Sequence, residues 1–120
     1  MSLYERLGGE PALQTAVDLF YRRMLRDERV APMFDDVDMD GQIAKQKAFL
    51  TYATGGPAEY TGEDMRTAHQ PLLARGLDDL HVDVVIEHLG AVLAELGAPA
   101  AEIAEVAALA NSVRGDVLGR

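Results

Sequence analysis

The sequence predicts a single all-α domain that covers residues 1–120. Three observations indicate this fold class. Apolar residues recur three and four positions apart over long stretches, Gly and Pro separate these stretches, and no segment shows the alternation typical of a strand. The length of 120 residues suits one domain, and a composition of 48% hydrophobic and 26% charged residues is ordinary for a globular protein.

The first long helix is predicted to follow Gly8-Gly9. Pro11 suits the first turn of a helix, because its missing amide hydrogen is not needed there. The pattern ends in an irregular corner, residues 26–38, which contains Pro32 and Phe34. The apolar stripe of this helix consists of Leu13, Val17, Phe20 and Met24, with Tyr21 and Leu25 beside it.

A second helix is predicted to begin near Asp38 and to end at Gly55-Gly56-Pro57. Thr61 and Asp64 then have capping-box-like spacing and predict a shorter helix that runs through His69. Pro71 is expected to end or bend that helix just past His69. The stripe of the second helix consists of Met39, Ile43, Gln46, Leu50 and Ala53, with Gln42 and Phe49 beside it.

Two more helices complete the predicted fold. The first is capped by Asp78 or Asp79, and Gly97-Ala98-Pro99 separates it from the second. Their stripes are Val82, Val85, Leu89, Val92 and Leu96 in the first, and Ile103, Val106, Ala110, Val113 and Val117 in the last.

Charge and composition exclude several classes of function. The formal net charge of −9 argues against nucleic acid and anionic membrane surfaces as partners, because both attract clustered Lys and Arg. The absence of Cys excludes disulfides, thiolate zinc sites and Cys-ligated haem. No stretch of about 18 apolar residues predicts a membrane span. No secretory signal is visible, so a cytoplasmic protein is expected.

Three residues break the apolar pattern. Gln46 lies within a stripe and Gln42 lies roughly 40° from it around the helix, so both amides are expected to face the interior. They bond either to each other, to the main chain or a trapped water, or to a shared polar ligand. His69 shares its helix face with Met65 and Leu72. It is either a core histidine or a metal ligand.

Spacing restricts the metal sites that histidine could form. His81 and His88 are seven positions apart, roughly 10 Å along a helix, which is too far for both to bind one ion. The sequence contains no HExxH motif, no Cys/His cluster and no EF-hand spacing. A site built on His69 alone suits a metal already held by four other nitrogens, as haem iron is.

The chain resembles the truncated haemoglobins of the first group over nearly its whole length. The matching segments are SLYERLGGEPAL, LFYRRML, VAPMF, KQKAFLTYATGGPAEYTG, MRTAHQPL, VVIEHL and VRGDVLGR, in this order and spacing. This resemblance implies a shortened globin fold, with two helices packed over two around haem b. It also implies a proximal iron ligand at His69, in the segment that follows GGP and YTG.

The resemblance implies the remaining site residues as well. Tyr21, Gln42 and Gln46 are expected in the distal pocket, where they stabilise a bound diatomic gas. Lys45 either packs its stem on apolar surface or acts as a sixth iron ligand. Lys47, Arg66 and Arg75 are candidate partners of the haem propionates. Further haem contacts are expected from Phe34, Phe49, Leu50, Met65, Leu72, Leu77, Val82 and Val85.

The implied activity is binding of dioxygen, and of nitric oxide or carbon monoxide, at haem iron. Conversion of nitric oxide to nitrate is a further hypothesis, and it requires an external reductase that the chain does not contain. The alternative is a haem-free helical interaction or regulatory module, in which Gln42, Gln46 and His69 form an internal polar network.

Overall fold

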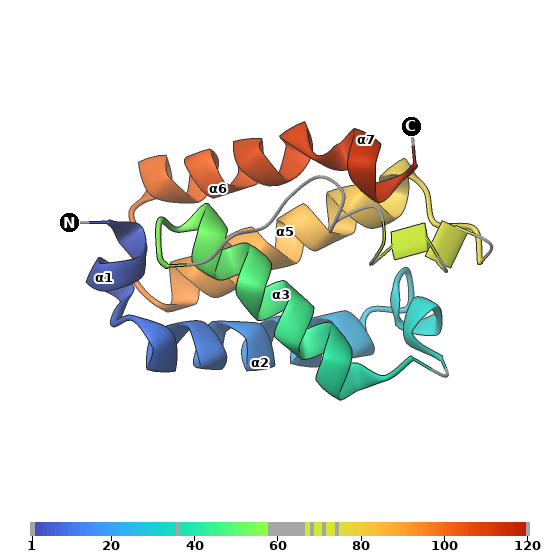
Figure 1. The fold of residues 1–120 in the computed structure, drawn as a ribbon, viewed down its shortest axis with the longest axis horizontal. Coiled ribbons are helices and arrows are strands. Elements are labelled where there is room, and N and C mark those ends of the chain that lie inside the picture. Colours follow the sequence, from blue (N-terminus) through green and yellow to red (C-terminus); the bar gives the residue numbers. More distant parts are fainter. Residues whose placement is uncertain are drawn as a thin grey trace.

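The computed structural model of the chain describes residues 2–35, 37–57, 67, 69, 70, 72, 73 and 75–119. Helices dominate this part of the chain, as the sequence predicts, and they are drawn in Figure 1. The molecule measures 40 × 28 × 24 Å along its principal axes. The elements are α1 (Leu3–Leu7), α2 (Glu10–Arg26), the 3₁₀ helix η1 (Ala31–Phe34), α3 (Met39–Ala53), α5 (Asp79–Glu95), α6 (Ala100–Ser112) and α7 (Arg114–Val117).

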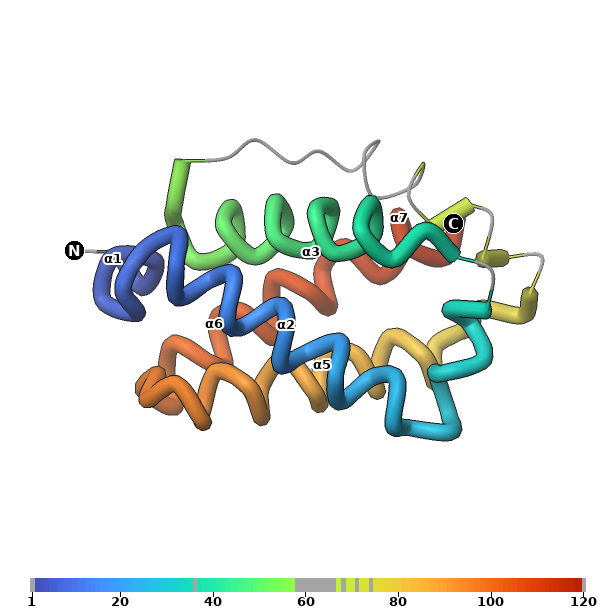
Figure 2. Tube along the Cα trace, turned by 90° about the horizontal axis from the view of Figure 1, so that it is seen from below, coloured from blue at the N-terminus to red at the C-terminus, as the bar shows by residue number. Residues whose placement is uncertain are grey.

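Four of these helices form two antiparallel pairs (Figure 1). α2 packs against α3, and α5 packs against α6 after the short connection at residues 96–99. α2 also packs on α5, which joins the two pairs. Figure 2 shows α3 running along one edge of the molecule, above α2 and α5. The cores of the two pairs therefore merge between α2, α3 and α5.

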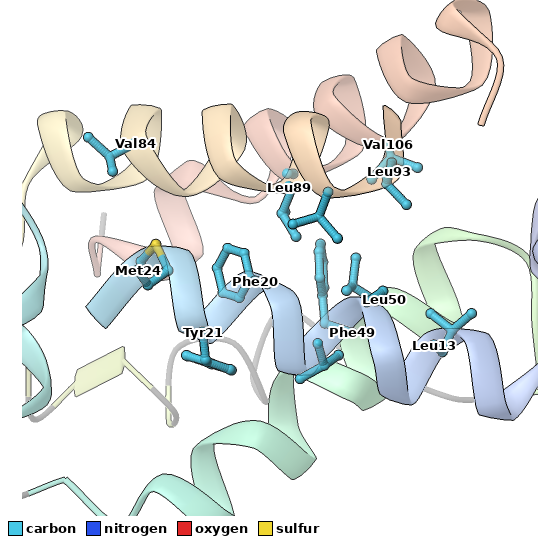
Figure 3. Packing of buried hydrophobic residues seen from close by; sticks show 14 of the residues in the cluster. Leu13, Phe20, Tyr21, Met24, Phe49, Leu50, Val84, Leu89, Leu93 and Val106 are labelled. Atoms are coloured by element: carbon cyan, nitrogen blue, oxygen red, sulfur yellow. The ribbon is translucent and has the colours of Figure 1, made fainter. Parts of the chain in front are cut away.

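The hydrophobic core fills the space between the two pairs. Phe20 and Met24 of α2 face Val84 and Leu89 of α5, and Phe49 of α3 enters the same cluster (Figure 3). The largest fully buried side chains are Phe20, Leu13, Leu50, Leu93, Val17, Val30, Val84 and Val92. Within the described part of the chain, no helix is long and apolar enough to cross a membrane.

The helix ends follow the local signals in the sequence. Gly8 and Gly9 have φ angles of 116° and 74°, which glycine adopts without steric cost, and α2 begins directly after them. The Asp38 carboxylate accepts a hydrogen bond from the Gly41 amide at 3.3 Å and caps α3. Asp78 caps α5 in the same way. These three helix starts confirm the predicted boundaries to within a residue or two.

Three details differ from the sequence prediction. α1 was not predicted, because a five-residue helix shows no periodicity. The last helix is not continuous: it stops at Ser112 and resumes as α7, which is held by hydrogen bonds from Arg114 to Asp79 and Asp83 of α5. Helical backbone also continues past His69, at residues 70, 72 and 73. The predicted start of that helix, at Thr61 and Asp64, lies outside the described residues, as does Pro71.

Candidate functional site

Two adjoining cavities lie between α2, α3, α5 and the segment that carries His69. Their volumes are about 60 and 70 Å³. Each is smaller than a typical ligand site of roughly 300–1,000 Å³, and the two share five lining residues. The residues that line both cavities are Gln46, His69, Leu77, His81 and Val85.

The other lining residues are mostly apolar and come from every element around the core. The first cavity is lined in addition by Phe20, Tyr21, Met24, Val30, Met33, Phe34, Gln42 and Leu72. The second is lined in addition by Phe49, Val82, Ile86, Leu89, Ala110, Val113 and Val117. Together they form a continuous apolar region with a few polar groups, which is the usual composition of a site for a flat organic ligand.

Hydroxyl and amide groups gather on the side of the first cavity formed by α2 and α3. Tyr21 is 4% exposed, and its hydroxyl donates a hydrogen bond to the main-chain carbonyl oxygen of Gln42 at 3.3 Å. Its ring makes edge contacts with Phe20 and Phe34, at centroid distances of 4.9 and 5.7 Å. Gln46 lies one helical turn beyond Gln42 on α3 and lines both cavities. This side therefore presents hydrogen-bond donors to the cavity.

His69 reaches the cavities from a different part of the chain. It lies on helical backbone, is partly buried and lines both cavities together with Gln46 of α3. The structure thus brings an imidazole and an amide, 23 positions apart in the sequence, to the wall of one apolar space. An imidazole at such a site can act as a metal ligand.

A second imidazole, His81, lines both cavities as well and was not predicted as a site residue. Its Nδ1 accepts a hydrogen bond from the Asp78 amide at 3.0 Å and completes the capping box of α5. The capping box uses only one of the two ring nitrogens of His81. The sequence gives one signal for this residue: a histidine in the first turn of a helix, three positions after an Asp cap.

Among the described residues that line the cavities, no three side chains form a group that could hold a bare ion. Among the described residues, three ligating side chains meet within 4.8 Å at Asp27, Glu87 and His88, and none of these lines either cavity. The guanidinium of Arg29 already bridges the two carboxylates of that group. A metal in the cavities must therefore bring most of its own ligands.

Most of the site residues expected from the sequence meet in this region. Those that line one or both cavities are Tyr21, Phe34, Gln42, Gln46, Phe49, His69, Leu72, Leu77, Val82 and Val85. Leu50 lines neither cavity and is 1% exposed in the hydrophobic core. Lys45 is exposed and lines neither cavity. Met65 and Arg66 lie outside the described residues.

The two described candidates for propionate binding have other partners. Lys47 forms an ion pair with the Glu10 carboxylate, and Arg75 donates hydrogen bonds to the carbonyl oxygens of Met33 and Asp35. The lining residues that sequence reasoning missed are Phe20, Met24, Val30, Met33, His81, Ile86, Leu89, Ala110, Val113 and Val117.

The chain is similar to known proteins over nearly its whole length. The bacterial-like globin family matches residues 2–118. The group 1 truncated haemoglobin of Synechocystis sp. is 53% identical over 112 residues, which cover 92% of this chain and 90% of that protein. The relative from Tetrahymena pyriformis is 45% identical over 119 residues, which cover 99% of this chain and 96% of that protein.

Solved structures of relatives have the same fold. The 2/2 haemoglobin of Synechococcus sp. PCC 7002, in the cyanomet state with covalently attached haem, has a TM-score of 0.89 and 44% identity over 100% of both chains. The Fe(III) form of the Tetrahymena pyriformis truncated haemoglobin has a TM-score of 0.85 and 45% identity, also over 100% of both chains. Structures of that Tetrahymena protein also exist with a tyrosine changed to phenylalanine, or with either of two glutamines changed to glutamate.

The fold and the cavities define an all-helical protein with an apolar ligand site between its two helix pairs. The chain belongs to the bacterial-like globin family and, within it, to the group 1 truncated haemoglobins.

Proposed function

We propose that this protein binds haem b in the two adjoining cavities, with His69 as the proximal iron ligand, and that it binds dioxygen there. Nitric oxide and carbon monoxide are further ligands of the same site. The observation that carries this proposal is the meeting of His69 with Tyr21, Gln42 and Gln46 around one apolar space. The haem of the Synechococcus and Tetrahymena relatives supports it.

The residues of the site fit the chemistry of haem. The walls are apolar and can contact both faces of a flat ring, and Phe34 lies at the corner between η1 and α3. No side-chain metal cluster lines the cavities within the described part of the chain, which agrees with an iron held by porphyrin nitrogens and one imidazole. His81 Nε2 is a candidate hydrogen-bond donor to a polar edge of the ring. When bound, haem supplies the reversible binding of diatomic gases.

The distal residues control how long such a gas stays bound. The hydroxyl of Tyr21 and the amides of Gln42 and Gln46 donate hydrogen bonds to a ligand that carries partial negative charge. Support comes from the Tetrahymena protein, because its altered tyrosine and two glutamines are separated along the chain by the same intervals as these three residues. We expect high oxygen affinity that is set mainly by slow release.

Haem uptake and its dependence on His69 test the proposal directly. Protein purified after haem-supplemented expression should show a Soret band, which His69→Ala should weaken or abolish. The matched control is His88→Ala, a histidine that lines neither cavity. A chain that takes up no haem would support the alternative, a haem-free helical module in which the same residues form an internal network. If the His69→Ala and control variants have equal spectra, His69 is not the iron ligand.

Lys45 is a candidate sixth ligand of the iron when no gas is bound. In this structure its side chain is exposed, so ligation requires the side chain to turn inward and its amine to lose a proton. The expected signature is a low-spin visible spectrum that Lys45→Ala abolishes. If the wild type and Lys45→Ala have the same spectrum, Lys45 does not bind the iron and remains a surface residue.

Nitric oxide dioxygenation is the enzymatic extension of this function. The distal donors hold dioxygen in a small apolar space that a second diatomic molecule can enter, which favours its reaction with nitric oxide to form nitrate. Turnover requires re-reduction of the iron by an external reductase. Rapid mixing of the oxygenated protein with nitric oxide should yield nitrate, and absence of nitrate would restrict the function to ligand binding.

A further inference from the structure

A second and larger concavity lies on the outer side of α2, away from the two cavities. It is an open cleft with a volume of about 730 Å³, within the range of ligand and docking sites. One side is the outward face of α2 and the residues that follow it, and the other is α5 and its end. The cleft is lined by Leu19, Arg22, Arg23, Arg26, Asp27, Glu28, Arg29, His88 and Glu95.

Arginine is concentrated at this cleft, whose lining contains four arginines and three acidic residues. The chain has 11 Lys and Arg residues and a net charge of −9, yet four arginines occur between positions 22 and 29, and all four line the cleft. Arginine, rather than lysine, is the side chain that binds carboxylates through two parallel hydrogen bonds. Positive charge at the C-terminal end of α2 also interacts favourably with the helix dipole. That effect is confined to the last turn and does not explain the cleft.

Most acidic groups in and beside the cleft are already paired. Arg23 pairs with Glu95 at 3.3 Å, and Arg29 pairs with Asp27 and Glu87 at 2.7 Å each. The Asp27 carboxylate accepts hydrogen bonds from Arg29 and, at 2.8 Å, from His88. These bonds hold the pKa of that carboxyl far below its usual range. Asp27 therefore remains an anion, and its charge is paired with Arg29 and His88.

Arg22 and Arg26 differ from the other two arginines. Both are exposed, they are one helical turn apart on the same face of α2, and neither forms an ion pair with the residues that the structure describes. Glu28 is the one acidic lining residue without such a pair in that part of the chain. Leu19 is the apolar residue of the cleft lining.

The position of the cleft relates it to the proposed haem site. Phe20, Tyr21 and Met24 line the first cavity from one face of α2, and Arg22 and Arg26 line the cleft from another. A helix with its side chains is about 10–12 Å across. A protein docked in the cleft is therefore separated from the cavity by about one helix.

From this geometry we infer that the cleft is the docking site for an acidic surface of a protein that donates electrons to the haem iron. The inference deepens the proposed function, whose extension to nitric oxide dioxygenation requires an external reductase, and rests on it. The partner is a one-electron carrier with carboxylates around its redox centre. It gives up one electron, and the ferric iron takes up that electron to become ferrous, with no transfer of atoms. Surface pairs of this kind favour fast association and short-lived complexes.

Binding of an acidic probe tests the cleft without relying on activity. The haem-loaded protein is titrated into a short, fluorescein-labelled oligoglutamate peptide at low ionic strength, and anisotropy is measured. Arg22→Gln/Arg26→Gln should weaken binding about two- to thirtyfold, and Arg22→Lys/Arg26→Lys should weaken it less, because lysine keeps the charge but not the paired hydrogen bonds. The matched control is Ala104→Glu/Ala108→Glu, which changes the net charge by the same amount at exposed, equally spaced positions on α6.

Three results would overturn the docking site. The first is equal weakening in the glutamine variant and the α6 control, because the effect would then be one of net charge. The second is displacement of the peptide by an equal concentration of inorganic phosphate, which would assign the cleft to a small anion. The third is failure of the wild-type protein to bind the peptide at low ionic strength.

Reduction kinetics separate this inference from the proposed function. The ferric protein is mixed with a reduced, acidic iron–sulfur ferredoxin in one arm and with dithionite in the other. The glutamine variant should be reduced more slowly by the ferredoxin, by about the same factor as its loss of peptide binding, and at the wild-type rate by dithionite. Equal ferredoxin rates in both proteins would remove the electron-transfer role. Absence of haem uptake, by contrast, would refute the proposed function, while peptide binding would still report on the cleft.

Discussion

Replacement of Tyr21 by phenylalanine isolates the contribution of one hydroxyl to ligand release. The ring of Tyr21 is buried and makes edge contacts with Phe20 and Phe34 that a phenylalanine ring preserves. The hydroxyl donates to the main-chain carbonyl oxygen of Gln42 at 3.3 Å, longer than the usual 2.7–2.8 Å of O–H···O bonds. Loss of such a weak bond should lower the free energy of unfolding by about 1 kcal/mol or less. The fold should therefore survive the substitution.

The effect on oxygen release follows from the same bond. A donor to a partly charged ligand contributes about 1–2 kcal/mol in a dry pocket, and Tyr21 must first give up its bond to Gln42, which offsets part of this. The net loss on substitution is about 0.5–1.5 kcal/mol. Oxygen release should therefore become about two- to twelvefold faster in Tyr21→Phe.

The assay is stopped-flow displacement of oxygen by carbon monoxide. Tyr52→Phe is the matched control, because Tyr52 is 44% exposed, belongs to α3 and lines neither cavity. Its oxygen release rate should equal that of the wild type. If the rate of Tyr21→Phe also equals that of the wild type, Tyr21 does not donate to the ligand and the distal argument is wrong.

Three further substitutions give expected outcomes. Gln46→Leu should speed oxygen release without loss of stability, because an apolar side chain of similar size replaces a partly buried amide. Gly56→Ala should lower the free energy of unfolding by about 1–3 kcal/mol in urea titrations, since a Cβ there would lie 2.6 Å from the ring of Tyr4. Asp27→Asn should destabilise the protein at neutral pH. Hydrogen bonds from Arg29 lower the pKa of that carboxyl from its usual 3.8, so its stabilising effect is present above about pH 4 and is lost as the pH falls through the lowered pKa.

Two of these outcomes have a control on the same chain. Gly115→Ala should have little effect on packing, because nothing lies within 4 Å of the added Cβ. Asp18→Asn removes an exposed carboxylate far from Arg29, so its effect on stability should not follow the pH dependence of the Asp27 variant. A difference between wild type and Asp27→Asn that stays constant from pH 7 into the acid range would contradict the ion-pair argument. If the oxygen release rate of Gln46→Leu equals that of the wild type, the Gln46 amide does not donate to the bound ligand.

The long helices could be predicted because their signals are local. Gly8-Gly9 and Asp38 mark helix starts by their own conformations and side-chain caps, so no tertiary contact is needed to find them. α1 could not be predicted in this way. It is held by the Ser2 cap and by a hydrogen bond from the Tyr4 amide to the Thr54 carbonyl oxygen at 2.8 Å, 50 positions away.

The candidate site could be predicted only in part. Sequence reasoning identified Gln42, Gln46 and His69 because each places a polar group on an apolar helix face. The structure brings all three to one cavity. His81 gave no such contrast, because a histidine near a helix start is explained by the cap alone. Leu50 was expected at the cavity, yet its position on α3 turns it into the core. Periodicity gives the buried face of a helix but not which part of that face meets a cavity.

The two proposed sites share one helix, and this makes their independence testable. Tyr21 and Arg22 are adjacent on α2, yet they line separate concavities because successive residues of a helix point about 100° apart. Tyr21→Phe should therefore change oxygen release and leave oligoglutamate binding unchanged, while Arg22→Gln/Arg26→Gln should do the reverse. In the combined variant, the oxygen release rate should match that of Tyr21→Phe and the peptide affinity should match that of Arg22→Gln/Arg26→Gln, each to within a few tenths of a kcal/mol, as expected for sites without shared partners. A clear departure in either quantity would mean that the two sites are coupled, and the cleft would then regulate the haem pocket rather than only deliver electrons to it.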